Sequence, residues 1–296
     1  MNNAGLNHED IELFYKLHGQ LLLFANERKK LFENIFSVKD LPNLGLEKIM
    51  ELRENLVKNT NLITSFVSEN PNLLPKEELQ IVENWKKGLH GDFYIVKYDK
   101  NHTIFYSPDS KKCYGVLHLI STFDEMLSQY LPILVRAWLI PFKDKITFDG
   151  LIAPYNISFG GGVSGGIKGD YEESIVRNGI ITTFEEDEEK TKKEESKDEE
   201  LLRFYLKSQA NRDRYWQEIE ELKESPELQK VYSQELGKLN GRHIKKRVKN
   251  KNVSAWFAVL EDFIVSSGKT KKELLDNLNN ILEDKQQVDL VHIFKT

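Results

Sequence analysis

The chain has 296 residues, of which 40 % are hydrophobic and 30 % charged, so it can bury a core without disulfides or metal. Its single cysteine, Cys113, excludes an intrachain disulfide framework and a cysteine-rich zinc site. The N-terminus lacks the pattern of a secretory signal, and no apolar stretch approaches the roughly 20 residues of a membrane span. We therefore expect a soluble, cytoplasmic protein.

The net charge of −5 is concentrated in one tract. Residues 185–200 contain ten acidic residues and four lysines, a net charge of −6, and the rest of the chain sums to about +1. The tract has almost no apolar residue, so it predicts a disordered linker or a charged extension of the next helix.

Amphipathic periodicity predicts helices in the first part of the chain. The predicted segments are residues 9–33, residues 46–69 and a helix that begins near Pro75, where proline suits a first helical turn. Together they predict a helical N-terminal unit.

The composition changes near Gly88, where β-branched and aromatic runs alternate with turn formers. Residues 92–98, 102–107 and 113–119 predict a three-stranded antiparallel meander. The segments that follow are predicted as a helix at 123–138 that Pro132 kinks or divides, strands at 146–152 and 155–159, a short helix at 170–177, and a strand at 180–184.

The C-terminal part is predicted to be mainly helical. The predicted helices cover residues 200–223, a segment from Pro226, residues 254–266 and residues 271–282, and residues 288–294 alternate as a terminal strand does. The predicted fold is therefore α+β, with a helical unit at 1–87, a mainly antiparallel module at 88–184, a charged linker at 185–200 and a mainly helical domain at 201–296.

A glycine cluster at residues 160–169, within the central module, suggests an anion-binding loop or a flexible or tightly turning connector, because bare amides ahead of a helix can hold an anion. It lacks the Gly-Lys-Ser/Thr ending of a phosphate loop, and its Gly-x-Ser-x-Gly match at Gly162, Ser164 and Gly166 is explained by glycine content. The candidate residues of the loop are Gly160, Gly161, Gly162, Gly165 and Gly166.

Carboxylates near the ends of predicted strands form a second candidate site. Asp92, Asp149 and Lys97 are the weak catalytic candidates of a metal-dependent nuclease, with Asp99, Asp124 and Glu125 as further ligands. The alternative is that they are ordinary turn and surface residues. The seven histidines lack metal-binding helical spacing, so the sequence predicts no metal site and no cofactor.

A basic run at 242–251 holds six cations and no acid. It could contact nucleic-acid phosphates or an acidic partner, including the 185–200 tract in another copy, or it could be a solvated helix end. Its cations are Arg242, Lys245, Lys246, Arg247, Lys249 and Lys251.

Residues 84–184 resemble a segment of uncharacterised bacterial proteins. The shared pattern consists of Trp85-Lys86, Gly91–Lys97, Tyr114–Leu117, Leu131-Pro132, Pro141–Ile146, Asp149–Ile152 and Asn156–Gly160. The resemblance implies a module of bacterial or bacteriophage type and transfers no catalytic residue.

Because no catalytic motif is complete, we expect a non-enzymatic protein that binds another protein, as an adaptor or inhibitor in a bacterial or phage setting. Homo-oligomerisation is open. The alternatives are a metal-dependent nuclease and a nucleic-acid-binding protein that uses residues 242–251.

Overall fold

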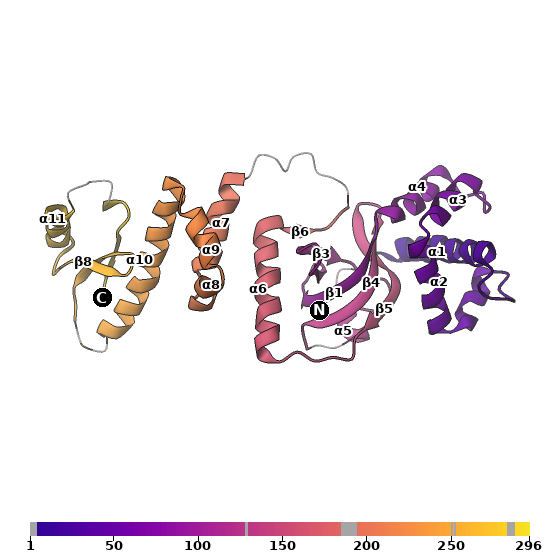
Figure 1. Ribbon diagram of the computed structural model, residues 1–296, viewed down its shortest axis with the longest axis horizontal. Coiled ribbons are helices and arrows are strands. Elements are labelled where there is room, and N and C mark those ends of the chain that lie inside the picture. The colour runs from indigo at the N-terminus through magenta and orange to yellow at the C-terminus, as the bar shows by residue number, and fades with distance from the viewer. Residues whose placement is uncertain (1–4, 128–129, 185–193, 250, 252, 283–287) are drawn as a thin grey trace. The chain divides into compact units, whose positions relative to one another are not determined.

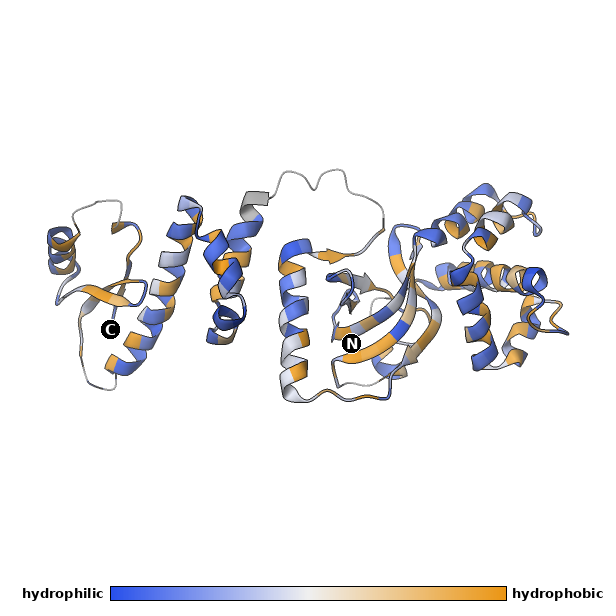
Figure 2. Ribbon diagram, viewed as in Figure 1, coloured by the Kyte–Doolittle hydropathy of each residue, from blue (hydrophilic) through white to orange (hydrophobic). Residues whose placement is uncertain are grey.

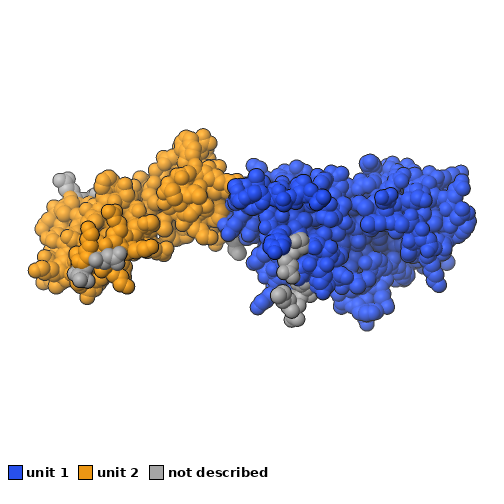
Figure 3. Space-filling view, turned by 90° about the horizontal axis from the view of Figure 1, so that it is seen from below, with its two compact units in different colours: residues 1–187 blue, residues 188–296 orange. Residues whose placement is uncertain are grey.

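The computed structural model describes residues 5–127, 130–184, 194–249, 251, 253–282 and 288–296 (Figure 1). It confirms the predicted α+β fold, with helices at both ends of the chain and a central mixed sheet. The chain divides into two compact units, residues 1–187 (unit 1) and residues 188–296 (unit 2), which Figure 3 colours separately. Among the described residues, no helix is long and apolar enough to cross a membrane.

Unit 1 begins with a helical layer. It consists of α1 (His8–Lys29), the 3-10 helix η1 (Val38–Leu44), α2 (Leu46–Lys58), α3 (Asn61–Glu69), α4 (Lys76–Asn84) and the 3-10 helix η2 (Trp85–Lys87). The Asn7 side chain accepts from the Asp10 N–H and so caps α1. Phe14 of α1 packs against Trp85 and against Phe142 of the sheet, at centroid distances of 5.8 and 5.9 Å. The predicted single helix at 46–69 is wrong, because a turn at residues 59–60 separates α2 from α3.

The helical layer packs on a six-stranded sheet of order β5-β4-β1-β2-β3-β6. All neighbours are antiparallel except β3 and β6. The strands are β1 (Leu89–Tyr98), β2 (Thr103–Ser107), β3 (Lys112–Val116), β4 (Ile133–Phe142), β5 (Lys145–Pro154) and β6 (Ile180–Ile181). The predicted meander is therefore confirmed, and the predicted strand at 180–184 is confirmed for its first two residues.

The sheet curls until the segment after β3 meets β5. The Leu117 N–H donates to the Ile146 carbonyl at 2.9 Å, and the Thr147 hydroxyl donates to the Leu117 carbonyl at 3.0 Å. The resulting partly closed barrel is filled by aromatic rings. Phe123, from the short helix α5 (Phe123–Met126), lies 5.1 Å from Phe105 and 5.0 Å from Phe148 between ring centroids. The Phe123 side chain is fully buried, so α5 closes the barrel with an apolar plug.

The predicted helix at 123–138 is wrong beyond its first turn. Residues from Ile133 onward form β4, which pairs with β1 on one side and β5 on the other. Leu134, Ala137 and Leu139 favour a helix in isolation, but a position between two strands lets the sheet override that preference. The Leu131–Pro132 peptide bond, which is cis, precedes the strand.

Helix α6 (Gly161–Asn178) covers the outer face of β1, β2 and β3 (Figure 1). Ile167 of this helix packs with Val96, Ile104, Tyr106 and Cys113. The predicted short helix at 170–177 is thus only the second half of α6, and the predicted strand at 155–159 is irregular backbone. The prediction failed because glycine disfavours helices, whereas here packing of the helix on the sheet supplies the stability. The glycine-rich first turns are pale in Figure 2.

Unit 2 combines a helical bundle with a three-stranded antiparallel sheet of order β8-β7-β9. Its helices are α7 (Glu194–Leu206), α8 (Gln209–Arg214), α9 (Trp216–Leu222), α10 (Pro226–Lys249) and α11 (Lys271–Ile281), and its strands are β7 (Trp256–Leu260), β8 (Phe263–Gly268) and β9 (His292–Lys295). Gly237 allows α10 to approach the sheet closely, since a Cβ there would lie 3.0 Å from the His292 Cβ and 3.1 Å from the Val259 carbonyl oxygen.

The predicted helix at 254–266 is wrong, because this segment forms the β7–β8 hairpin. Its aromatic and β-branched residues favour strands, but the turn carries no glycine or asparagine to mark it. Glu261 adopts the left-handed conformation instead, with φ 53°. Most of the predicted linker at 185–200 lies outside the described residues, and α7 begins at Glu194.

Candidate functional site

The three nuclease candidates do not share a site. Asp92 of β1 is held by Arg136 of β4, whose Nε and Nη2 donate to the two carboxylate oxygens at 2.8 and 3.1 Å. Lys97 pairs with Asp99 at 2.8 Å. Asp149 of β5 is buried beside Arg53 of α2. Within the described ranges, no group of three His, Cys, Asp or Glu residues is placed to hold a metal ion.

Asp149 belongs to a buried ionic cluster between the helical layer and the barrel. Its carboxylate lies 3.4 Å from Nη1 of Arg53, and both side chains are fully buried. Burial raises the pKa of Asp149 to about 7, against the opposing charge of Arg53. Burial also lowers the pKa of His18 to about 4, and Arg53 lowers it further. The cluster connects the helical layer to the barrel. None of its residues lines either of the two cavities described in unit 1.

The glycine cluster is not a loop but the N-terminal part of helix α6. Gly160 is the N-cap of α6, and the other four candidates lie in its first turns, where a Cβ would meet nothing within 4 Å. The Ser164 hydroxyl donates to the Phe159 carbonyl at 3.3 Å, so Gly162, Ser164 and Gly166 form a helical turn and not a strand-to-helix elbow.

The basic run lies at the C-terminal end of α10 in unit 2. Arg242, Lys245, Lys246, Arg247 and Lys249 occupy its last turns with exposed side chains, and Lys251 is also exposed. None of them forms an ion pair with a described residue. The run therefore stays a candidate polyanion-binding surface of unit 2.

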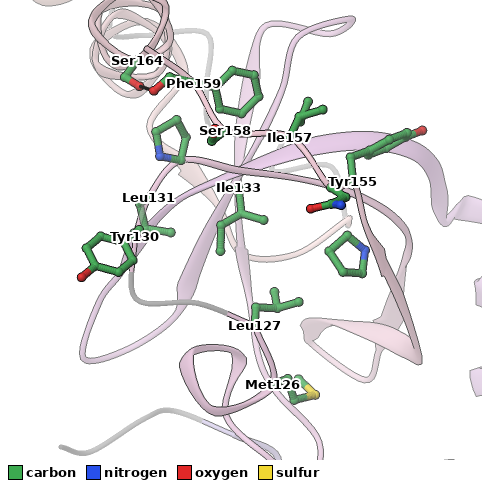
Figure 4. Close-up of a pocket in the computed structure, with 13 residues that line it drawn as sticks. Met126, Leu127, Tyr130, Leu131, Ile133, Tyr155, Ile157, Ser158, Phe159 and Ser164 are labelled. Atoms are coloured by element: carbon green, nitrogen blue, oxygen red, sulfur yellow. Dashed lines mark hydrogen bonds between the residues drawn. The ribbon is translucent and has the colours of Figure 1, made fainter. Parts of the chain in front are cut away.

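A concave site in unit 1 lies outside the three nuclease candidates and the basic run. A cavity of about 580 Å³ is lined by residues 126–127, 130–133 and 154–159 and by Ser164 (Figure 4). A second cavity of about 240 Å³ shares Leu131, Pro132 and Ser164 with the first and continues along α6 to Lys168 and Tyr171. We call the larger cavity the apolar groove.

The groove forms where two paired strands of the sheet begin and end. Pro132 precedes β4 and Pro154 ends β5, so the paired strands stop at the same edge of the barrel and their extensions diverge. The segment 155–159 then crosses to the start of α6. It contributes Tyr155, Ile157 and Phe159, and Phe159 packs on Tyr94 of β1 at 5.6 Å between centroids.

Tyr155, which lines the groove, is held by contacts with two neighbouring strands. Its hydroxyl donates to Oδ1 of Asp92 at 2.9 Å, its backbone N–H donates to the Leu134 carbonyl at 3.0 Å, and the Arg136 guanidinium lies 6.0 Å from its ring centroid. The hydrogen bond from Arg136 holds the pKa of Asp92 below its usual range, so the carboxylate stays an acceptor for Tyr155. Asp92 thus links Arg136 to the Tyr155 hydroxyl.

None of the described residues that line the larger cavity has a charged side chain, although 30 % of the chain is charged. Exposed apolar side chains form its rim: Tyr130 is 89 % exposed, Ile157 53 % and Met126 38 %. Such a surface favours an uncharged ligand with apolar groups, and its polar side chains, which include Asn156, Ser158 and Ser164, are uncharged. In the sequence, the only signs of this groove are the apolar residues around Leu131-Pro132 and Pro154-Tyr155. A prediction of helices and strands from the sequence assigns such residues to a core.

Searches of family models, curated proteins and solved structures found no match to this chain.

Proposed function

We propose that this protein is a binding protein whose apolar groove holds an uncharged, apolar segment of a partner protein. The observation that carries the proposal is the exposed, charge-free lining of the larger cavity, which includes Met126, Tyr130, Tyr155 and Phe159. Interface cores are enriched in tyrosine, phenylalanine and methionine and depleted of lysine and carboxylates. Exposed apolar surface around a cavity is typical of protein-binding sites.

Preorganisation supports the same function. Ordering a side chain on binding costs roughly 0.5–1.5 kcal/mol, and Tyr155 avoids much of that cost because Asp92 and Arg136 already fix its ring. An aromatic ring fixed beside a cavity is a typical anchor for a partner side chain.

The first test is selection of peptides from a displayed library of random 12-residue sequences on the full-length protein. The affinity of the selected peptides is then measured for wild type and for the variant Ile157→Asp, which places a charge on the rim. Ile157 is 53 % exposed, so the substitution does not bury a charge in the free protein. The matched control is Ile120→Asp, because Ile120 is 72 % exposed and lines neither cavity.

We expect selected peptides to be apolar and uncharged, to bind wild type and Ile120→Asp alike, and to bind Ile157→Asp at least tenfold more weakly. A tenfold loss corresponds to about 1.4 kcal/mol, the scale of one interface anchor. The proposal would be contradicted if no peptide were selected, or if the selected peptides bound Ile157→Asp as tightly as wild type.

A second variant tests the role of Asp92. Tyr155→Phe keeps the ring and removes the hydroxyl that donates to Asp92. We expect it to weaken peptide binding less than Tyr155→Ala does, with the difference in the dissociation rate, because the ring remains but is held less firmly. Equal effects of the two variants would mean that the ring itself makes no contact with the peptide.

A further inference from the structure

The last turns of α10 carry a stripe of cations that the proposed groove function does not use. The sequence has no acidic residue between Glu235 and Glu261, and seven lysines and arginines lie in that interval. This is the most basic stretch of a chain whose net charge is −5.

Helical geometry collects four of these cations on one face. Arg242, Lys245, Lys246 and Lys249 follow the spacing i, i+3, i+4 and i+7, so they lie within an arc of about 100° and extend over about 10 Å. All four are exposed. The neighbouring face of the helix is buried against the unit 2 sheet through Gly237 and Gly241, which fixes the direction in which the stripe points.

The stripe is not neutralised by the described part of the chain. No ion pair joins its four cations to a described carboxylate, whereas Lys238, one turn earlier, pairs with Glu235 at 2.8 Å. His292 of β9 lies beside this region. Burial lowers the pKa of His292, and the charges of Lys238 and Arg242 lower it further, as expected for a net positive potential at this end of the helix.

We propose that this stripe binds the phosphate backbone of nucleic acid without reading its sequence. Duplex nucleic acid carries one charge per roughly 1.7 Å of axis, so a stripe of about 10 Å faces about six phosphates. The stripe consists of three lysines and one arginine in a continuous row. Such a row is better suited to contacts with phosphates than to contacts with bases. A membrane surface fits less well, because the apolar residues of these turns, Ile244 and Val248, are half-buried and not free to insert.

The test is fluorescence anisotropy of a labelled 20-base-pair DNA duplex with the full-length protein, at potassium chloride concentrations from 50 to 200 mM. Four phosphate contacts predict a slope of about −3.6 for log K against log salt. The variant Lys245→Gln/Lys246→Gln removes two contacts. It should lower the magnitude of the slope by about 1.8 and weaken binding about 60-fold at 0.1 M salt. Glutamine preserves helix propensity, so the helix should stay folded.

The matched control is Lys207→Gln/Lys272→Gln, which removes two exposed lysines of unit 2 outside the stripe. We expect this control to bind the duplex within twofold of wild type. Absence of duplex binding by wild type at 50 mM salt would overturn the proposal, and so would equal losses in the stripe variant and the control. Retention on anionic lipid vesicles or on a polyglutamate peptide, without duplex binding, would overturn it in favour of those partners.

Discussion

Replacing Asp149 with asparagine is predicted to have little effect on the stability of unit 1 at pH 5 and to stabilise it at pH 8. The Asp149 carboxyl is fully buried 3.4 Å from Arg53, and burial raises its pKa from 3.8 to about 7. At pH 5 the folded protein therefore holds a neutral acid, which asparagine closely mimics. At pH 8 wild type must keep a buried carboxylate, and the variant does not.

Proton linkage gives the magnitude. A raised folded-state pKa means that stability falls as the pH rises from the unfolded value toward the folded value, so Asp149 lowers the stability of wild type by about 2.6 kcal/mol between pH 5 and pH 8. His18 acts in the opposite direction. Its pKa falls from 6.5 to about 4 on folding, so stability rises by about 2 kcal/mol over the same pH interval. Wild type should thus show a nearly flat profile, and Asp149→Asn should show a profile that rises by about 2 kcal/mol.

The assay is urea unfolding at pH 5, 6, 7 and 8, read by hydrogen–deuterium exchange of peptides from α2 and β5, so that unit 1 is followed separately from unit 2. The control is Asp144→Asn, which changes an exposed carboxyl of the same unit and should leave the profile of wild type unchanged. If Asp149→Asn were less stable than wild type at pH 8, Asp149 would be an ordinary ionised partner of Arg53 and the account of the buried cluster would be wrong.

Three further predictions concern packing and reactivity in unit 1. Phe123→Ala should destabilise it by about 3–5 kcal/mol in urea titrations, because Phe123 fills the barrel between Phe105 and Phe148; a loss below about 1 kcal/mol would show that the plug is dispensable. Gly162→Ala should raise the melting temperature slightly, by a stabilisation of about 0.4–1 kcal/mol, since a Cβ there meets nothing within 4 Å; a lower melting temperature would reveal a hidden contact. Burial raises the pKa of the Cys113 thiol to about 11, so a thiol reagent at pH 8 should label it only in urea, and rapid labelling of the native protein would contradict its burial against α6.

The sequence predicted elements well where periodicity and turn chemistry agreed. The β1–β2–β3 meander is an example, since its strands are rich in β-branched and aromatic residues and its connections carry aspartate, asparagine and proline. Residues 133–142 were missed because their helix-favouring side chains lie in a strand between two others, a tertiary effect that local composition does not encode. The α6 glycines were missed for the converse reason, since packing of Ile167 and its neighbours sustains a helix that propensity disfavours.

The candidate site was harder to predict than the fold. Asp92 was selected as a possible metal ligand because carboxylates near strand ends are common in nucleases, but cross-strand pairing places it opposite Arg136. The groove depends on two segments, 130–133 and 154–159, that lie more than 20 residues apart and meet only because β4 and β5 pair. Apolar residues in such segments look like core until the ends of the strands are known.

The most direct test of the groove is hydrogen exchange of the full-length protein with and without a saturating amount of a selected peptide. We predict slower exchange of backbone amides in residues 130–133 and 154–159 of wild type, with no change in the β7–β8 hairpin of unit 2. In Ile157→Asp, the peptide should change the exchange of none of these segments. Protection confined to other segments, or the same protection in Ile157→Asp, would contradict the assignment of the groove as the binding site.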